Sequence, residues 1–129
     1  MPAREGAGRR SRRGRLSRSA DFDRVFREGR SHASRHLVLY AFPRAESATD
    51  GGQPRLGVSV GRKVGGAVER TRVKRVLREA FRALESELPG DHDFVLVARP
   101  EAGARAREGG EPRVEEDLRE LVRSAGLVA

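Results

Sequence analysis

The chain has 129 residues, no Cys, and a formal net charge of +8 from 27 Lys and Arg against 19 Asp and Glu. This length suits one domain, and the absence of Cys excludes disulfides, thiolate metal sites and a cysteine nucleophile. The chain has neither an apolar run of the roughly 18 residues that span a membrane nor the apolar core of a secretory signal, so we expect a cytoplasmic protein.

Positive charge is concentrated in the first two-thirds of the chain. Residues 1–82 contain 21 cations and 8 acids, whereas residues 83–129 contain 6 cations and 11 acids. This asymmetry is typical of a protein that presents one side to an anionic partner. Only Lys63 and Lys74 are lysines. Arg suits bidentate phosphate contacts, but a genome that favours Arg codons explains the excess equally well.

The first 15 residues hold six Arg and three Gly without apolar periodicity, which predicts a disordered basic arm. We therefore place a single domain at 16–126, followed by a short tail at 127–129. The domain is expected to begin with a short helix that Ser19 caps and Gly29 ends.

Apolar residues of this short helix share one face, because Phe22, Val25 and Phe26 recur at helical spacing. The six apolar residues at 37–42 are too few for a helix and predict a strand buried on both faces. Residues 44–54 are polar and rich in turn formers, so we expect a surface loop there.

A second strand is predicted at 56–60, where Leu and Val alternate with Gly and Ser. After the Gly-rich connection 61–66, a long helix is expected at 67–88, because apolar side chains recur along one side at a 3.6-residue period. Gly66 is an acceptable N-cap for this helix, and Pro89 follows its predicted end.

Residues 94–98 are the third predicted strand, and we interpret Asp91 and Asp93 as part of a solvated turn before it. A loop with three Gly is expected at 101–111, followed by a helix from Pro112 onward. The order α-β-β-α-β-α favours an α/β (α+β) two-layer sandwich. The long helix connects the second and third strands, so these strands can be parallel.

Motifs for catalysis by the protein itself are missing. The Gly-rich connection continues as Gly66-Ala67-Val68 rather than Gly-Lys-Ser/Thr, which argues against a P-loop. No Ser lies in a G-x-S-x-G elbow, and the three His lack partners at metal-ligand spacing. We therefore expect no catalytic residue and no metal site in the protein.

The outer side of the long helix carries the strongest functional signal. Positions 70–82 hold six cations and one acid, Glu79. The cations are Arg70, Arg72, Lys74, Arg75, Arg78 and Arg82. Like charges four residues apart repel, so this side should destabilise the helix unless an anion lies against it. A solvated helix face would mix both signs, and the pattern favours contact with RNA or phosphate.

A second candidate surface combines aromatic and basic side chains. Phe22 and Phe26 project from the short helix, and Tyr40 projects from the first strand. The cations that interleave with them are Arg18, Arg24, Arg27 and Arg30. Aromatic rings beside guanidinium groups are typical of single-stranded nucleic-acid sites, where bases stack and cations contact phosphates. Packing of the rings in the core explains the pattern equally well, so both interpretations stay open.

Residues 57–82 (GVSVGRKVGGAVERTRVKRVLREAFR) closely resemble the signature of the bacterial ribonuclease P protein family. Further matches in order and spacing are Arg15-Leu16, Asp21-Phe22, residues 25–30 and residues 37–40. The resemblance covers about residues 15–99 and is weaker in the last helix. It implies a mixed sheet with an uncommon left-handed βαβ crossover, as in ribonuclease P proteins and a related ribosomal-protein fold.

The resemblance also implies a function. Ribonuclease P removes the 5′ leader of precursor tRNA, and its RNA subunit cleaves the phosphodiester with Mg²⁺ ions that sit mainly on RNA. The expected partners are the catalytic RNA and precursor tRNA, with no membrane and no small-molecule substrate. The protein alone is expected to be inactive.

Site residues follow from the same resemblance. The family's contacts to the catalytic RNA correspond to Arg62, Lys63, Arg70, Thr71, Arg72, Lys74, Arg75 and Arg78. Its cleft for the single-stranded leader corresponds to Phe22, Phe26 and Tyr40, with Arg30 beside them. Thr71 replaces the Asn of the family's Arg-Asn-Arg motif, so a hydrogen bond to RNA is expected to change or be lost.

Two other functions fit parts of the sequence. A ribosomal-protein-like module that coats folded RNA would share the composition and the basic helix, but not the aromatic cleft or the long signature. A protein-only nuclease would need metal-binding carboxylates. The one acidic cluster, at 111–120, is explained by its position near a helix N-terminus.

Overall fold

The computed structural model describes residues 15–16, 19–43 and 54–127, without the side chains of residues 105, 107 and 108. Most of the predicted arm, Arg18, and most of the predicted loop at 44–54 lie outside the described residues. The elements are α2 (Ser19–Glu28), β1 (Arg30–Ala33), β2 (Leu37–Pro43), β3 (Arg55–Val60), α3 (Ala67–Leu84), the 3-10 helix η2 (Glu85–Glu87), β4 (His92–Ala98) and α4 (Ala102–Ser124).

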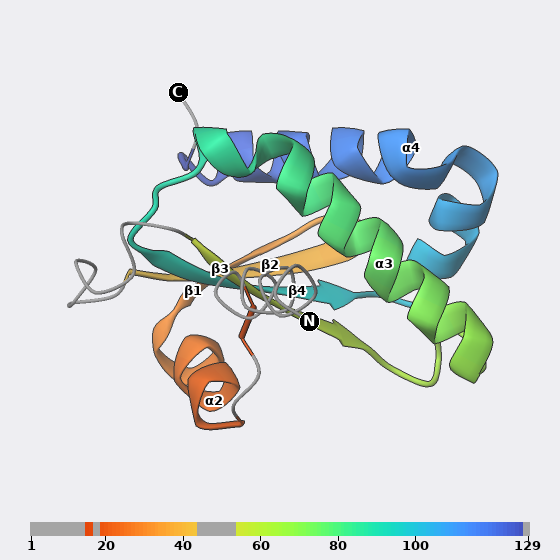
Figure 1. Ribbon diagram of the computed structural model, residues 1–129, viewed down its shortest axis with the longest axis horizontal. Coiled ribbons are helices and arrows are strands. Elements are labelled where there is room, and N and C mark those ends of the chain that lie inside the picture. The colour runs from red at the N-terminus through yellow and green to blue at the C-terminus, as the bar shows by residue number, and fades with distance from the viewer. Residues whose placement is uncertain (1–14, 17–18, 44–53, 128–129) are drawn as a thin grey trace, which may run out of the picture.

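Four strands form one mixed sheet in the order β1-β2-β4-β3 (Figure 1). β2 runs antiparallel to β1 and β4, whereas β3 and β4 are parallel neighbours connected through α3. The predicted α+β fold with a mixed sheet is therefore confirmed, as is the parallel pairing of the second and third predicted strands. The hand of the crossover stays a prediction.

Helices lie on both faces of this sheet, with α3 and α4 side by side on one face and α2 on the other (Figure 1). The main core fills the space between the sheet and α3 and α4. Its largest fully buried side chains are Leu37, Leu39, Leu77, Leu84, Phe94, Leu96 and Leu118. Burying one such side chain contributes about 1.5–3 kcal/mol, so this face dominates the stability of the fold.

The opposite face has a smaller apolar cluster, formed by Leu16, Val25 and Val95. α2 covers this cluster as a partial third layer. Phe22 also packs there, directly over Gly57, where a Cβ atom would lie 2.5 Å from the Phe22 ring. The absence of a side chain at Gly57 thus lets α2 approach the sheet closely.

Both ends of the chain differ slightly from the prediction. Arg15, which we assign to the arm from sequence, forms a parallel bridge with Leu56 at the edge of β3. Ser19, the expected N-cap, is itself the first residue of α2. Leu127, assigned to the tail from sequence, packs against the main core.

The prediction is wrong for β1 and for the end of α3. β1 is absent from the predicted order because its sequence, RSHA, has no apolar pattern; its conformation depends on pairing with β2. α3 ends at Leu84 rather than Leu88. The apolar spacing continues to Leu88 because the turn of 3-10 helix keeps that side chain buried.

The loop expected at 101–111 is helical instead. α4 begins at Ala102 and bends at Gly110, whose φ of 65° and ψ of −157° interrupt the helix before Pro112. Ala102 and Ala106 are buried in the main core. This burial favours a helix in a Gly-rich segment that by composition is typical of a loop.

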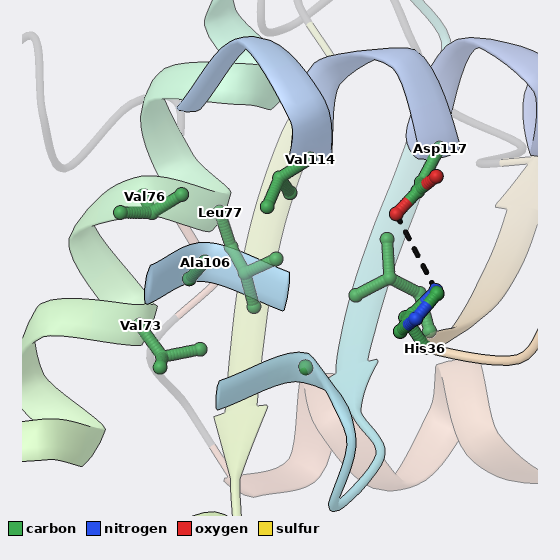
Figure 2. Close-up of a pocket in the computed structure, with 9 residues that line it drawn as sticks. His36, Val73, Val76, Leu77, Ala106, Val114 and Asp117 are labelled. Carbon is green, nitrogen blue, oxygen red and sulfur yellow. Dashed lines mark ion pairs between the residues drawn. The ribbon is translucent and has the colours of Figure 1, made fainter. Parts of the chain in front are cut away.

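A pocket lined mainly by apolar side chains lies between α3 and α4, with His36 and Asp117 at its edge (Figure 2). The His36 Nδ1 atom is 3.4 Å from an Asp117 carboxylate oxygen, which ties the turn before β2 to α4. The pocket is on the face of the sheet away from α2. In the described part of the chain, no helix is long and apolar enough to cross a membrane.

Gly110→Ala should destabilise the protein by about 1–3 kcal/mol, because non-Gly residues are strained in this backbone region. Urea denaturation measures the change. Gly61→Ala is the matched control, since its added Cβ meets no atom within 4 Å, and should change stability by less than about 0.5 kcal/mol. Equal stability of both variants would contradict the role of Gly110 in the bend.

Glu111, directly after the bend, provides a pH-dependent prediction. Burial raises its pKa above the usual range, and the carboxylates of Glu115 and Glu79 raise it further. The charged form of Glu111 therefore destabilises the fold at neutral pH, and this cost disappears as pH falls below about 4. Glu111→Gln should raise the melting temperature at pH 7 but not below pH 4, whereas exposed Glu116→Gln should have little effect. Equal melting temperatures for wild type and Glu111→Gln at pH 7 would refute the prediction.

Candidate nucleic-acid interface

The cations of α3 occupy its outer side because its apolar residues face the core. Val73, Leu77, Ala80 and Leu84 are buried, which leaves the remaining positions to polar side chains. These positions form two flanks. Arg70, Lys74 and Arg78 lie on one flank and are half-buried, whereas Thr71, Arg72 and Arg75 lie on the other and are exposed. The structure thus brings the predicted α3 residues together along one helix.

The half-buried flank is an unbalanced positive site. Burial lowers the pKa of the Arg78 guanidinium, and the charges of Arg15 and Arg82 lower it further. The Nε atoms of Arg70 and Arg78 are buried without a hydrogen-bond partner. Among the described residues, no carboxylate forms an ion pair with these two side chains. An anion placed there would both relieve the repulsion and supply the missing acceptors.

The turn between β3 and α3 extends this surface. Arg62 and Lys63 are exposed, whereas the next residue, Val64, is buried and donates a backbone hydrogen bond to Gly61 at 3.1 Å. Gly66 is the N-cap of α3, as predicted, and its carbonyl accepts the first helical hydrogen bond from Arg70 at 2.8 Å. The anchored turn therefore presents two more cations at the positive end of the helix dipole.

An aromatic group lies on the other face of the sheet, where α2 meets β2. The Phe26 ring packs edge-on against Tyr40 with 4.8 Å between centroids, and Phe22 lies 6.3 Å from Phe26. Phe26 is 40% exposed, although such a ring buries readily. Phe22 packs over the sheet, which agrees with the core-packing interpretation. The exposed ring of Phe26 agrees instead with the interpretation as a stacking surface.

Arg30 does not join the aromatic group. It is the register partner of Ala41, whose side chain is buried on the face covered by α3 and α4. Tyr40 projects from the opposite face, because side chains alternate along a strand. The expectation that Arg30 lies beside the aromatic residues is therefore wrong, and the pairing register that determines its face is not visible in the sequence.

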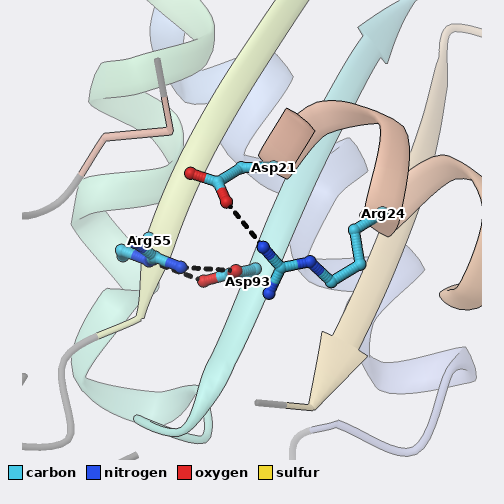
Figure 3. Close-up of polar contacts among 4 residues, drawn as sticks. All are labelled: Asp21, Arg24, Arg55 and Asp93. Atoms are coloured by element: carbon cyan, nitrogen blue, oxygen red, sulfur yellow. Dashed lines mark hydrogen bonds and ion pairs between the residues drawn. The ribbon is translucent and has the colours of Figure 1, made fainter. Parts of the chain in front are cut away.

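Four charged residues of α2 and the sheet form two ion pairs (Figure 3), and of these four only Arg55 is not singled out from the sequence. Asp93 is inside β4 and 1% exposed, and Arg55 donates two hydrogen bonds of 2.8 Å to its carboxylate. The prediction that Asp93 belongs to a solvated turn is thus wrong. On α2, Arg24 donates a 2.9 Å hydrogen bond to Asp21, and its guanidinium is 5.9 Å from the centre of the Phe42 ring.

Acidic side chains are concentrated on α4 and η2. Arg119 joins Glu87 and Glu115 at 2.9–3.0 Å, which neutralises part of this region. Within the described residues, no three His, Asp or Glu side chains are grouped to hold a metal ion. Mg²⁺ prefers carboxylate and phosphate oxygens, and a surface of guanidinium groups does not fit a protein-bound Mg²⁺ site.

Comparison with known proteins identifies the family. The model of the ribonuclease P family matches residues 11–126. The ribonuclease P protein component of Clostridium acetobutylicum is 37% identical over 114 residues, which cover 88% of this chain and 90% of that protein. The protein component of Halalkalibacterium halodurans is 43% identical over 90 residues, covering 68% of this chain and 71% of its own length.

Solved structures show the same fold. The ribonuclease P protein of Staphylococcus aureus superposes with a TM-score of 0.74 at 28% identity, over 90% of this chain and 98% of that one. The Thermotoga maritima protein gives a TM-score of 0.71 at 30% identity, over 84% and 96% of the two chains. The chain therefore belongs to the bacterial ribonuclease P protein family, whose members are the protein component of the endoribonuclease that matures tRNA 5′ ends.

Proposed function

We propose that the protein binds two RNAs through two different surfaces. The outer side of α3 and the turn before it bind the catalytic RNA of ribonuclease P. The aromatic group formed by Phe22, Phe26 and Tyr40 binds the single-stranded 5′ leader of precursor tRNA. The observation that carries the second assignment is the exposed Phe26 ring, held edge-on against Tyr40 on a sheet face that α2 covers only in part.

The charge and exposure of α3 support the first assignment. Arg72 and Arg75 are exposed, as is Thr71 beside them, so the two guanidinium groups can contact phosphates without rearrangement of the core. Folded RNA offers closely spaced phosphates, which match a helix with cations on successive turns. Val68 is 85% exposed on the same flank and adds an apolar contact for a ribose or base edge.

The aromatic group supports binding of an unpaired strand rather than a duplex. A base in a duplex is already stacked, whereas an unpaired base can stack on a side chain, which contributes about 1–3 kcal/mol. The leader is the unpaired part of precursor tRNA. A module that only coats folded RNA would have no use for this surface, so dependence of affinity on the leader separates the two functions.

The reaction itself is assigned to the RNA subunit. Mg²⁺ would supply activated water and charge neutralisation on RNA phosphates, and the cations of α3 would steady the RNA fold around these ions. The protein contributes no nucleophile and is inactive without the RNA. We assign its place of action to the bacterial cytoplasm, where precursor tRNAs are made.

Phe26→Ala should weaken binding of leader-bearing precursor tRNA to the reconstituted holoenzyme by about 5- to 150-fold, the loss expected for one stacked base. Binding of mature tRNA should not change. Tyr40→Phe keeps the ring and is the matched control, with little expected loss. Equal weakening for both RNAs, measured by filter binding, would refute the leader assignment.

Arg72→Gln should weaken binding to the catalytic RNA. It should also reduce the slope of log affinity against log salt by about 0.7–0.9 for each phosphate that the variant no longer neutralises. Arg123→Gln removes another exposed cation, from α4, and should leave the slope unchanged. A salt titration of both variants measures the difference. If the affinity of both variants falls equally, the positive charge acts only through the net charge of the protein.

A further inference from the structure

The edge of β3 carries a short segment that joins the two faces of the sheet. Arg15 and Leu16 pair with this edge through a parallel bridge between Arg15 and Leu56 and a 2.8 Å backbone hydrogen bond from Leu16 to Leu56. We propose that Arg15 and Arg78 together bind one backbone phosphate of the leader strand, at a site separate from the exposed flank of α3 that binds the catalytic RNA. This assignment of the two flanks of α3 to different RNAs rests on the function proposed above.

The pairing register sends the two side chains of the segment to opposite faces of the sheet. Arg15 is the register partner of Leu56, whose side chain is buried in the main core, so Arg15 projects on the side of α3. Leu16 projects on the side of α2, where it is buried in the smaller apolar cluster. Backbone pairing and the burial of Leu16 therefore hold the exposed Arg15 side chain at the edge of β3.

Arg78 approaches the same place from α3. Burial lowers the pKa of its guanidinium, and the charges of Arg15 and Arg82 lower it further, so Arg15 is close enough for the two charges to repel each other. The Nε atom of Arg78 is also buried without a hydrogen-bond partner. A phosphate between the two guanidinium groups would remove the repulsion and accept the missing hydrogen bond.

The position of this site favours the leader over the folded catalytic RNA. Phe22 and Leu16 pack side by side over Gly57, where a Cβ atom would lie 2.5 Å from the Phe22 ring and 3.2 Å from the Leu16 Cβ. Consecutive Cα atoms are about 3.8 Å apart, so Arg15 is one residue beyond the edge of the aromatic group. An unpaired strand that passes Phe22 and turns around the edge of β3 therefore meets Arg15 next.

Exposure separates the two flanks of α3 in the same way. Arg70, Lys74 and Arg78 are half-buried, whereas Arg72 and Arg75 are exposed. The half-buried cations recur every four residues, about 6 Å along the helix. Such a row suits a single strand, because proteins bind unpaired nucleic acid in a positively charged groove that follows its backbone. The surface of a folded RNA reaches the exposed flank more easily than the recessed one.

Precursor tRNAs that carry one uncharged methylphosphonate, each at a different leader position, test the site in the reconstituted holoenzyme. At one position the substitution should weaken binding to wild type about tenfold, the loss expected for a hydrogen bond between charged groups. Arg15→Gln and Arg78→Gln should weaken binding of unmodified precursor tRNA by a similar factor, and the methylphosphonate at that position should then have no further effect. The double variant should lose little more than either single variant, because both side chains hold the same phosphate.

Three controls separate this effect from a loss of net charge or of folding. Arg123→Gln removes an exposed cation from α4 and should leave precursor binding unchanged. Mature tRNA and the catalytic RNA should bind Arg15→Gln and Arg78→Gln as they bind wild type. Arg15→Gln should fold even if Arg78→Gln does not, because the side chain of Arg15 is exposed and its backbone pairing does not depend on that side chain.

Two results would overturn the inference. One is a loss of affinity for the catalytic RNA in these variants as large as the loss for precursor tRNA, which would assign the site to the catalytic RNA. The other is a leader preference that Phe26→Ala removes but that Arg15→Gln and Arg78→Gln leave unchanged, in which case the proposed function stands and the phosphate site does not. If wild-type holoenzyme itself shows no leader preference, the proposed function fails as well.

Discussion

The packing of α3 against the sheet is the constraint on which the rest of the structure depends. Its apolar side chains fill the main core between β3, β4 and α4, so the cations of the helix are either exposed or half-buried at the rim of this core. The repulsion among cations at i and i+4 costs roughly 0.2–0.5 kcal/mol per pair. Each buried Leu or Val of the same helix contributes several times more. The fold can therefore carry an unpaired basic surface without losing the helix.

The sheet separates this basic helix from the aromatic group. α3 and α4 lie on one face, and the shorter α2 lies on the other. Burial of an aromatic ring is favourable, yet Phe26 on this face stays 40% exposed. Gly57 lets α2 approach closely enough for Phe22 to pack over the sheet beside Val95, whereas Phe26, later on the same helix, packs edge-on against Tyr40 instead.

Sequence alone predicts the parts of the fold that rest on long periodic patterns. α3 and β3 follow from hydrophobic spacing, and β2 follows from a continuous apolar run. The parallel β3–β4 pair follows from the long helix that connects the two strands, and the outward direction of the α3 cations follows from the helical period. The helix at 102–110 could not be predicted, because two adjacent Gly at its end suggest a loop and only burial of Ala102 and Ala106 reveals the helix. The burial of Asp93 depends on Arg55, 38 residues earlier in the chain. No local pattern contains that pairing, and the same limit applies to the face on which Arg30 lies.

The edge of β3 is where the two proposed surfaces meet. Arg15 forms a bridge with Leu56 at this edge, next to Gly57, over which Phe22 packs. The same Arg15 is near enough to Arg78 of α3 to lower its pKa. Arg15 therefore places one cation at the sheet edge between the aromatic face and the basic helix. Since a backbone hydrogen bond of 2.8 Å from Leu16 to Leu56 fixes the chain there, the cation at this junction is held by β-pairing, and its position does not depend on RNA.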